Sequence, residues 1–168
     1  LLGEQIKIYM NDSTIDWAHI INQALTVEMK DSIHYNQVSG KEMKAYFING
    51  DMRHIEVIGN VLTAFYPEEK DSTMIGMNTS ETSLLNLHLM NRKMEKMVMS
   101  PKSNGTLYPM DQIPVDKMKL PTFVWFDYIR PQNKEDIFNW RGKKSGETLR
   151  KTTRKPVTSP KRELNKLN

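Results

Sequence analysis

Three stretches of the chain alternate strictly between apolar and polar residues, and this alternation restricts the possible folds more than any other feature. Successive side chains of a β-strand point to opposite faces of a sheet, so a period of two predicts strands with one apolar face. No stretch before about residue 99 keeps a helical period for more than a turn or two. We therefore expect an all-β fold with little helix. The alternating apolar residues are Ile6, Ile8 and Met10, then Met43, Ala45 and Phe47, then Leu85, Leu87 and Leu89.

The middle of the chain also repeats itself. Lys30-Asp31-Ser32 recurs as Lys70-Asp71-Ser72, and residues 24–27 resemble residues 61–64 as part of a shorter third copy. Chance similarity between β-rich segments is the competing explanation. Repeated hairpins predict a succession of short antiparallel strands stacked into a solenoid or an elongated roll. Nine pairs share one offset of 42 residues: Met43, Ala45, Phe47, Asn49, Met52, Ile55, Val57, Tyr66 and Pro67 fall opposite Leu85, Leu87, Leu89, Asn91, Met94, Met97, Met99, Tyr108 and Pro109.

The turns of these hairpins decide which residues pair. A two-residue turn at Asn49-Gly50 would pair Phe47 with Met52 and would turn His54 and the residues in step with it onto the apolar face. A three-residue loop keeps the apolar residues of both strands together, and the same loop fits 91–93. The sequence therefore predicts the pairs Phe47–Arg53, Ala45–Ile55, Met43–Val57, Leu87–Met97 and Leu85–Met99.

The pattern changes after Pro109. Residues 110–120 predict a short irregular or helical piece, 123–126 a short apolar strand, and 133–140 one helical turn. Asn133 is a suitable N-cap for that turn because acidic residues follow it directly.

Charge divides the chain into two parts. Residues 141–168 hold ten Lys and Arg against two Glu, which is +8, so residues 1–140 carry −4 of the total +4. All fourteen aromatic residues also lie in 1–140. We therefore expect a β domain over 1–140 and a disordered basic tail over 141–168, because the tail cannot bury enough apolar surface to fold. The tail is either a solvated end or a contact for lipid phosphates. Residues 1–140 show no basic face with interleaved aromatic residues, so we expect no nucleic acid partner.

The residues needed for most catalytic and metal-binding chemistry are missing. The chain has no cysteine, no nucleotide-binding or hydrolase motif, and four histidines at no metal-ligand spacing. His54 and His88 are expected to face solvent. We expect neither an enzyme nor a bound metal or cofactor. The chain does not begin with Met, and it reads as the C-terminal part of a longer product from which a signal peptide was removed.

Methionine, at 12 residues, is the distinctive component. Four of these residues cluster between 90 and 99. Flexible thioethers either fill an ordinary core or adapt to irregular apolar ligands such as acyl chains. The residues expected to form a lipid-binding interior face are Met43, Ala45, Phe47, Ile55, Val57, Leu85, Leu87, Leu89, Met97 and Met99.

Several short segments resemble one known family. Residues 55–67, with Gly59-Asn60 and Tyr66-Pro67, are similar to a signature of OstA-like proteins, the organic-solvent-tolerance family that includes lipopolysaccharide transport protein A. The likeness is to the Bacteroidetes-type members and covers about residues 20–138. The other matching segments are Gly76-Met77-Asn78, 83–87, 104–109, Arg130-Pro131 and Asp136-Ile137-Phe138.

This resemblance implies a twisted β-jellyroll of V-shaped strands whose interior holds the acyl chains of lipopolysaccharide or a related glycolipid. It also implies end-to-end docking of such domains, by their edge strands, into a periplasmic bridge to the outer membrane. The expected function is therefore non-enzymatic lipid binding and bridging, in a head-to-tail homo-oligomer. The rival expectation is a structural β-solenoid scaffold or adhesin-like module with a dry core.

Overall fold

The computed structural model describes residues 1–91 and 93–139. Within them, residues up to Pro109 form one open antiparallel sheet of six strands in chain order. The expectation of an all-β fold is confirmed. The predicted tail over 141–168, and Trp140 before it, lie outside the described residues. The strands are β1 (Gln5–Asn11), β2 (Thr14–Met29), β3 (Tyr35–Ile48), β4 (Asp51–Phe65), β5 (Gly76–Met90) and β6 (Lys93–Pro109).

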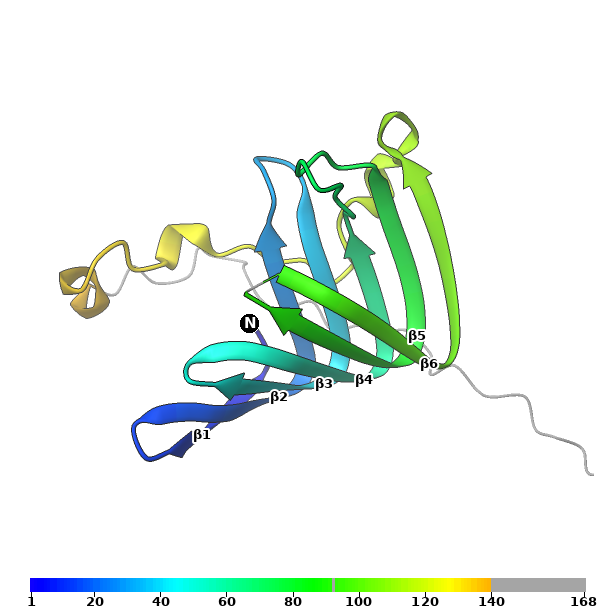
Figure 1. Cartoon of the computed structure of the whole chain (residues 1–168). Coiled ribbons are helices and arrows are strands. Elements are labelled where there is room, and N and C mark those ends of the chain that lie inside the picture. Colours follow the sequence, from blue (N-terminus) through cyan, green and yellow to red (C-terminus); the bar gives the residue numbers. More distant parts are fainter. Residues whose placement is uncertain (92, 140–168) are drawn as a thin grey trace, which may run out of the picture.

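Strands β2 to β6 bend sharply near their middles, so that the sheet doubles back on itself in a V (Figure 1). At each bend the pairing of neighbouring strands shifts by one residue, as at a β-bulge. Asn22 and Gln23 have φ of 58° and 50° there, and Gly59 and Asn60 have φ of 81° and 48°. The prediction of short strands was wrong, because Gly59-Asn60 bends a strand of 15 residues and does not end it.

We call the part of the sheet nearer the hairpin turns the hairpin layer (5–21, 42–58 and 84–100). The part beyond the bends is the second layer (24–29, 35–40, 61–65, 76–82 and 103–109), and the row of bends between them is the fold line. Figure 1 shows the two layers meeting along the fold line and separating away from it.

The first register prediction was partly wrong. The turn is the two-residue Asn49-Gly50, with φ of 53° and 80°, so Phe47 pairs with Met52 and not with Arg53. This is the mirror-image turn that suits the twist of a hairpin. A bulge at Arg53 then adds one residue to β4, and the predicted pairs Ala45–Ile55 and Met43–Val57 are both formed. The bulge lets a tight turn and a continuous apolar face coexist.

All three hairpins of the hairpin layer follow one plan. In each, seven residues of the first strand and eight of the second flank a two-residue turn: 5–11 with 14–21, 42–48 with 51–58, and 84–90 with 93–100. The eighth residue is the bulge, which falls at Asp16, Arg53 and Glu95. The predicted pairs Leu87–Met97 and Leu85–Met99 are confirmed, but from a two-residue turn in place of the expected 91–93 loop.

The repeated Lys-Asp-Ser triplets occupy equivalent loops at the far end of the second layer. The Asp31 carboxylate accepts hydrogen bonds from the backbone N–H groups of Ile33 and His34, at 2.9 and 2.8 Å. The Asp71 carboxylate accepts one from the N–H of Thr73 at 3.0 Å. Both aspartates therefore close a tight turn with the side chain.

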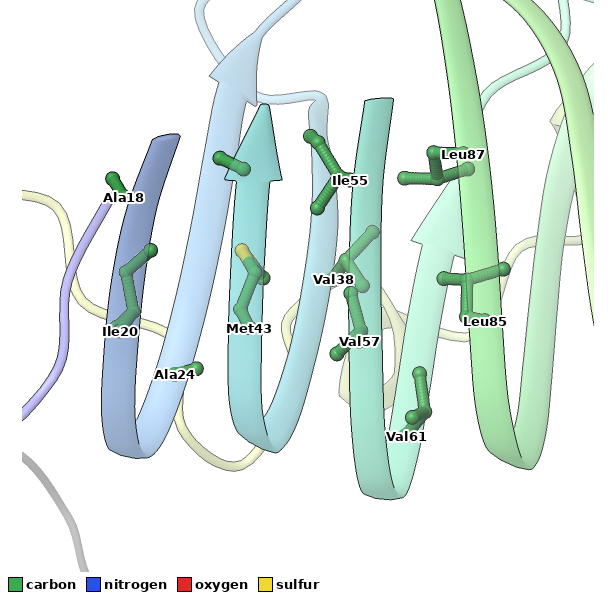
Figure 2. Close-up of a cluster of buried hydrophobic side chains, with 11 residues drawn as sticks. Ala18, Ile20, Ala24, Val38, Met43, Ile55, Val57, Val61, Leu85 and Leu87 are labelled. Carbon is green, nitrogen blue, oxygen red and sulfur yellow. The ribbon is translucent and has the colours of Figure 1, made fainter. Parts of the chain in front are cut away.

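The main core lies inside the V, where both layers contribute to one buried cluster (Figure 2). Its hairpin-layer members come from β2, β3, β4 and β5, whereas Ala24, Val38 and Val61 come from the second layer. The hairpin-layer members are Ala18, Ile20, Met43, Ala45, Ile55, Val57, Leu85 and Leu87.

Residues 110–139 form short 3₁₀ helices and irregular backbone: η1 (Met110–Gln112), η2 (Val115–Lys117), η3 (Asp127–Ile129) and η4 (Glu135–Phe138). The Gln37 side chain fastens this segment to the sheet, donating to the Met118 carbonyl at 2.7 Å and accepting from the Leu120 N–H at 2.9 Å. The predicted strand at 123–126 is wrong, since these residues pair with no strand in the described structure. The predicted helical turn begins later than expected, with Lys134 as the N-cap of η4, although Asn133 accepts a hydrogen bond from the N–H of Asp136.

Candidate ligand-binding cavity

A cavity of about 780 Å³ is lined by residues of both layers on the side away from the fold line. Its volume falls in the range of about 300–1,000 Å³ that is usual for small-molecule sites. The lining residues come from both layers and from the loops at the mouth. The hairpin layer supplies Met52, Ile55, Leu87, Leu89, Met94 and Met97, and the second layer supplies Thr26, Glu28, Asn36, Val38 and Phe65.

Apart from Asn91 and Lys93 at the β5–β6 turn, the hairpin-layer wall is apolar, because β4, β5 and β6 present alternate residues to the inside of the V. Ile55, Leu87 and Met97 form one row across these three strands. The bulges at Arg53 and Glu95 bring Met52 and Met94 onto the same face as this row. The result is a continuous wall of thioether and aliphatic side chains.

All ten residues predicted for the interior face lie in or against the main core cluster, but at two depths. Those on β3, β4 and β5 away from the hairpin turns are buried, whereas Phe47 and Leu89 near the turns, and Met97 and Met99 on the edge strand β6, are half-buried. Ile55, Leu87, Leu89 and Met97 line the cavity. The fully buried group is Met43, Ala45, Val57 and Leu85 at 0% exposure, with Ile55 and Leu87 at 4% and 6%; the half-buried group is Phe47, Leu89, Met97 and Met99.

Two cavity residues, Met52 and Met94, were absent from the predicted interior face. The predicted three-residue loop put Arg53 opposite Phe47, which left Met52 out of step with the apolar face. A signal for the bulge exists in the sequence: two polar residues separate Met52 from Ile55, and two separate Met94 from Met97. The second-layer wall, which mixes polar and apolar residues, had no such signal, because its position depends on how the sheet folds back.

Charged residues surround the mouth. Lys30 forms an ion pair with Glu68 at 2.5 Å, which joins the β2–β3 loop to the β4–β5 loop. Glu69, Lys70 and Lys93 also line the opening. The mouth therefore carries both signs of charge, and the apolar wall lies behind it.

The β2–β3 loop is held by a second ionisable pair. The Asp31 carboxylate lies 2.6 Å from His34 Nδ1. This hydrogen bond, together with those from the N–H groups of Ile33 and His34, lowers the pKa of Asp31 from 3.8 to about 2.

Tyr66 packs beside this loop with its ring 4.9 Å from the His34 ring. Its hydroxyl is buried and has no hydrogen-bond partner among the described residues. Burial, followed by the nearby Asp31 charge, raises the pKa of Tyr66 because both disfavour a phenolate.

The outer face of the hairpin layer carries a ladder of stacked rings. Neighbouring centroids are 4.0 to 6.2 Å apart, and the interplanar angles are between 4° and 21°. His54 and His88 are the last two rings, stacked at 4.8 Å on the face that was expected to meet solvent. The ring faces are occupied by one another, so the ladder offers little flat surface for stacking a ligand. Its members are Tyr9, Trp17, Tyr46, His54 and His88, one from each of β1 to β5.

The sheet ends in two unpaired edges within the described residues. β1 pairs only with β2, and β6 pairs only with β5. On β1 the inward-pointing Ile6, Ile8 and Met10 are 45%, 56% and 58% exposed. An apolar strand with a free backbone edge is a site at which another strand can add.

The described residues hold neither a metal-type cluster nor a membrane-spanning helix. In residues 1–91 and 93–139, no three His, Asp or Glu side chains gather as a metal cluster would require. No helix of the described chain is long and apolar enough to cross a membrane. No protein-family model, curated protein or solved structure matches this chain.

Proposed function

We propose that this chain is a non-enzymatic lipid-binding domain of the lipopolysaccharide-transport type, which holds the acyl chains of a glycolipid in the interlayer cavity. On this proposal it works in the periplasm as one element of a bridge toward the outer membrane. The observation that carries the proposal is the apolar hairpin-layer wall behind a charged, open mouth.

The chemistry of the two walls supports an amphiphilic ligand. Acyl chains gain free energy when they leave water for an apolar surface, at about 25 cal/mol per Å² of buried area. Leu89, Met94 and Met97 provide such a surface, and the two methionine thioethers adapt to irregular chains. The polar head of the ligand would remain at the mouth, near Lys30, Lys70 and Lys93.

The free edges support a bridging role. A β6 edge of one domain and a β1 edge of another could pair by backbone hydrogen bonds, as in other strand additions. The partners proposed here are further β-jellyroll domains or copies of this chain arranged head to tail. Ile8→Lys would place a charge on the exposed apolar face of β1, and light scattering should show it shifting any oligomer toward monomer. Asp12→Lys, in the adjacent turn, is the control.

A photo-crosslinking amino acid tests the cavity directly. Leu89 and His88 are neighbours on β5 that point to opposite faces, Leu89 into the cavity and His88 into the ring ladder. We expect a crosslinker at Leu89 to capture purified lipopolysaccharide, and a crosslinker at His88 to capture much less. The readout is a lipopolysaccharide-positive band of increased mass on a gel.

Equal labelling at the two positions would contradict the cavity proposal, as would no labelling at Leu89. Repeating the experiment with vesicles of a palmitoyl-oleoyl phospholipid separates a glycolipid site from a general acyl-chain site. Capture of the phospholipid alone would leave an acyl-binding cavity but overturn the lipopolysaccharide assignment.

One observation favours the second candidate, a structural β-solenoid scaffold or adhesin-like module. Met43, Ala45, Val57 and Leu85 have no exposed surface, so the inside of the V is a dry, packed core near the fold line. If the cavity also closes in solution, native mass spectrometry of gently purified protein should find no bound lipid. Met52→Lys would then leave cell-envelope integrity unchanged.

A further inference from the structure

A second cavity, of about 370 Å³, borders the fold line. Ser39 and Leu62 line it, and they pair with each other across β3 and β4. Their chain neighbours Val38 and Val61 point into the core of the V (Figure 2). Successive side chains of a strand alternate between the two faces, so Ser39 and Leu62 point outward. This outer cavity therefore lies on the opposite side of the sheet from the interlayer cavity, and the two share no lining residue.

Segments far apart in the sequence meet at the outer cavity. Glu4 comes from the N-terminal segment, and its backbone N–H donates to the Asn22 carbonyl at 3.0 Å. Thr122 comes from the segment that Gln37 fastens to the sheet, and Gln37 points outward because it is in step with Ser39. The fold line supplies the other long polar side chains, which are Asn22, Gln23, Lys41 and Asn60.

Two residues of the outer cavity carry buried polar atoms with no hydrogen-bond partner among the described residues. Thr122 is 5% exposed, and its hydroxyl is one of these atoms. The other is the amide oxygen of Gln23. The Gln23 Nε2 donates to the Glu4 carboxylate at 2.8 Å, which fixes the orientation of the amide and leaves its oxygen without a donor. Because buried polar groups are nearly always hydrogen-bonded, both atoms point to a polar molecule bound beside them.

The other lining groups indicate the chemical class of that molecule. Three primary amides and two hydroxyls line the outer cavity, and each of these groups both donates and accepts hydrogen bonds. Glu4 and Lys41 contribute one charge of each sign, so the lining favours a ligand without net charge. The amides belong to Asn22, Gln23 and Asn60, and the hydroxyls to Ser39 and Thr122.

We propose that the outer cavity binds a single neutral sugar ring. Neighbouring hydroxyls of a sugar donate and accept at closely spaced atoms, which matches the mixed amide and hydroxyl lining. Leu62 offers an apolar contact for the C–H groups of the ring. The volume falls at the lower end of the range of about 300–1,000 Å³ for small-molecule sites, so it suits one ring better than a chain of them. The proposal does not rest on lipid binding, since the interlayer cavity is a separate site.

The test is an NMR titration of ¹⁵N-labelled protein with the methyl glycosides of glucose, galactose, mannose and N-acetylglucosamine. We expect at least one of them to shift the side-chain amide signals of Asn22, Gln23 and Asn60. The amide signal of Asn86, which is hydrogen-bonded to His54 in the hairpin layer, should stay in place. The dissociation constant should be on the order of 1 mM, because a ligand with few atoms gains little binding energy.

A pair of matched variants separates binding at this site from a change in the fold. Thr122→Val removes the hydroxyl, keeps the shape of the side chain and should weaken glycoside binding about tenfold. Thr63→Val is the control, because the Thr63 hydroxyl is also buried without a partner but Thr63 lines neither cavity. Both variants replace an unpaired buried hydroxyl with a methyl group, so both should stay folded, and the control should bind as the wild type does.

Three outcomes would overturn the proposal. The first is that none of the four glycosides shifts the amide signals of the outer cavity. The second is that the two valine variants weaken binding equally, which would show that the effect does not come from this site. The third concerns glycine, a zwitterion that Glu4 and Lys41 would hold by their opposite charges. If glycine shifted the signals and the glycosides did not, the sugar assignment would be wrong.

Discussion

The inside of the V behaves differently at its two ends, although the same strands and the same apolar face form both. Near the fold line, Met43, Val57 and Leu85 meet second-layer side chains such as Val61 and have no exposed surface. Toward the hairpin turns, Met52, Leu89 and Met94 are half-buried around a cavity. The layers meet at the bends and diverge from them, so the geometry of the V alone makes one end a core and leaves the other end open.

The largest expected difference between the two ends is in stability. Leu85→Ala should lower the free energy of unfolding by about 2–5 kcal/mol, because it leaves a cavity in a packed core. Leu89→Ala should cost less than half as much, since Leu89 already borders open space. Urea denaturation of both variants measures this. Equal losses would mean that the cavity is closed in solution.

Substitutions at the fold line should lower stability where they disturb its left-handed backbone conformation. Gly59→Ala should destabilise the chain by about 2 kcal/mol, since φ is 81° there and an added Cβ would lie 2.9 Å from the Cβ of Lys41. Gly50→Ala, in the β3–β4 turn at φ of 80°, meets nothing within 4 Å and should cost about 1 kcal/mol. Thermal unfolding compares the two. If the two variants lost the same stability, backbone strain alone would explain the loss, and crowding against Lys41 at the bend would contribute nothing.

Substitutions at the open end of the V should affect ligand binding more than they affect stability. Met52→Lys places a charge on the apolar wall and should reduce lipopolysaccharide crosslinking at Leu89 by tenfold or more, which corresponds to about 1.4 kcal/mol. Met52→Leu keeps the wall apolar and should retain crosslinking. Unchanged capture by the lysine variant would show that this wall does not contact the ligand.

The smallest expected effect concerns the loop at the mouth and appears only in acid. The pKa of Asp31 is about 2 in the folded chain and 3.8 for a free side chain, so its stabilising contribution is complete above pH 4 and is lost as the pH falls through 2. Asp31→Asn should therefore lower the melting temperature slightly at pH 6 and flatten its fall between pH 4 and pH 2. If the melting temperatures of the wild type and the variant fell in parallel between pH 4 and pH 2, the low pKa of Asp31 would be contradicted.

Local periodicity in the sequence predicted the strands, the apolar face and most of the pairing. It missed the bulge after each turn, although the spacing from Met52 to Ile55 already breaks the alternation by one residue. It also missed the fold line, because Asn22-Gln23 adopts left-handed backbone without a glycine. The cavity could not be predicted, since its second-layer wall faces the hairpin-layer wall only after the strands bend.

The equal hairpins have a consequence for how a molecule of this kind can change in size. Each unit spans seven residues, a two-residue turn and eight residues, so the hairpin tips end level and every unit crosses the V at the same width. One residue gained or lost inside a hairpin would misalign the apolar face and move the tip out of line. A whole hairpin, with its second-layer extension, could be added without disturbing its neighbours. The number of residues in each hairpin therefore sets the width of the space between the two layers. The number of hairpins sets the length of that space along the fold line.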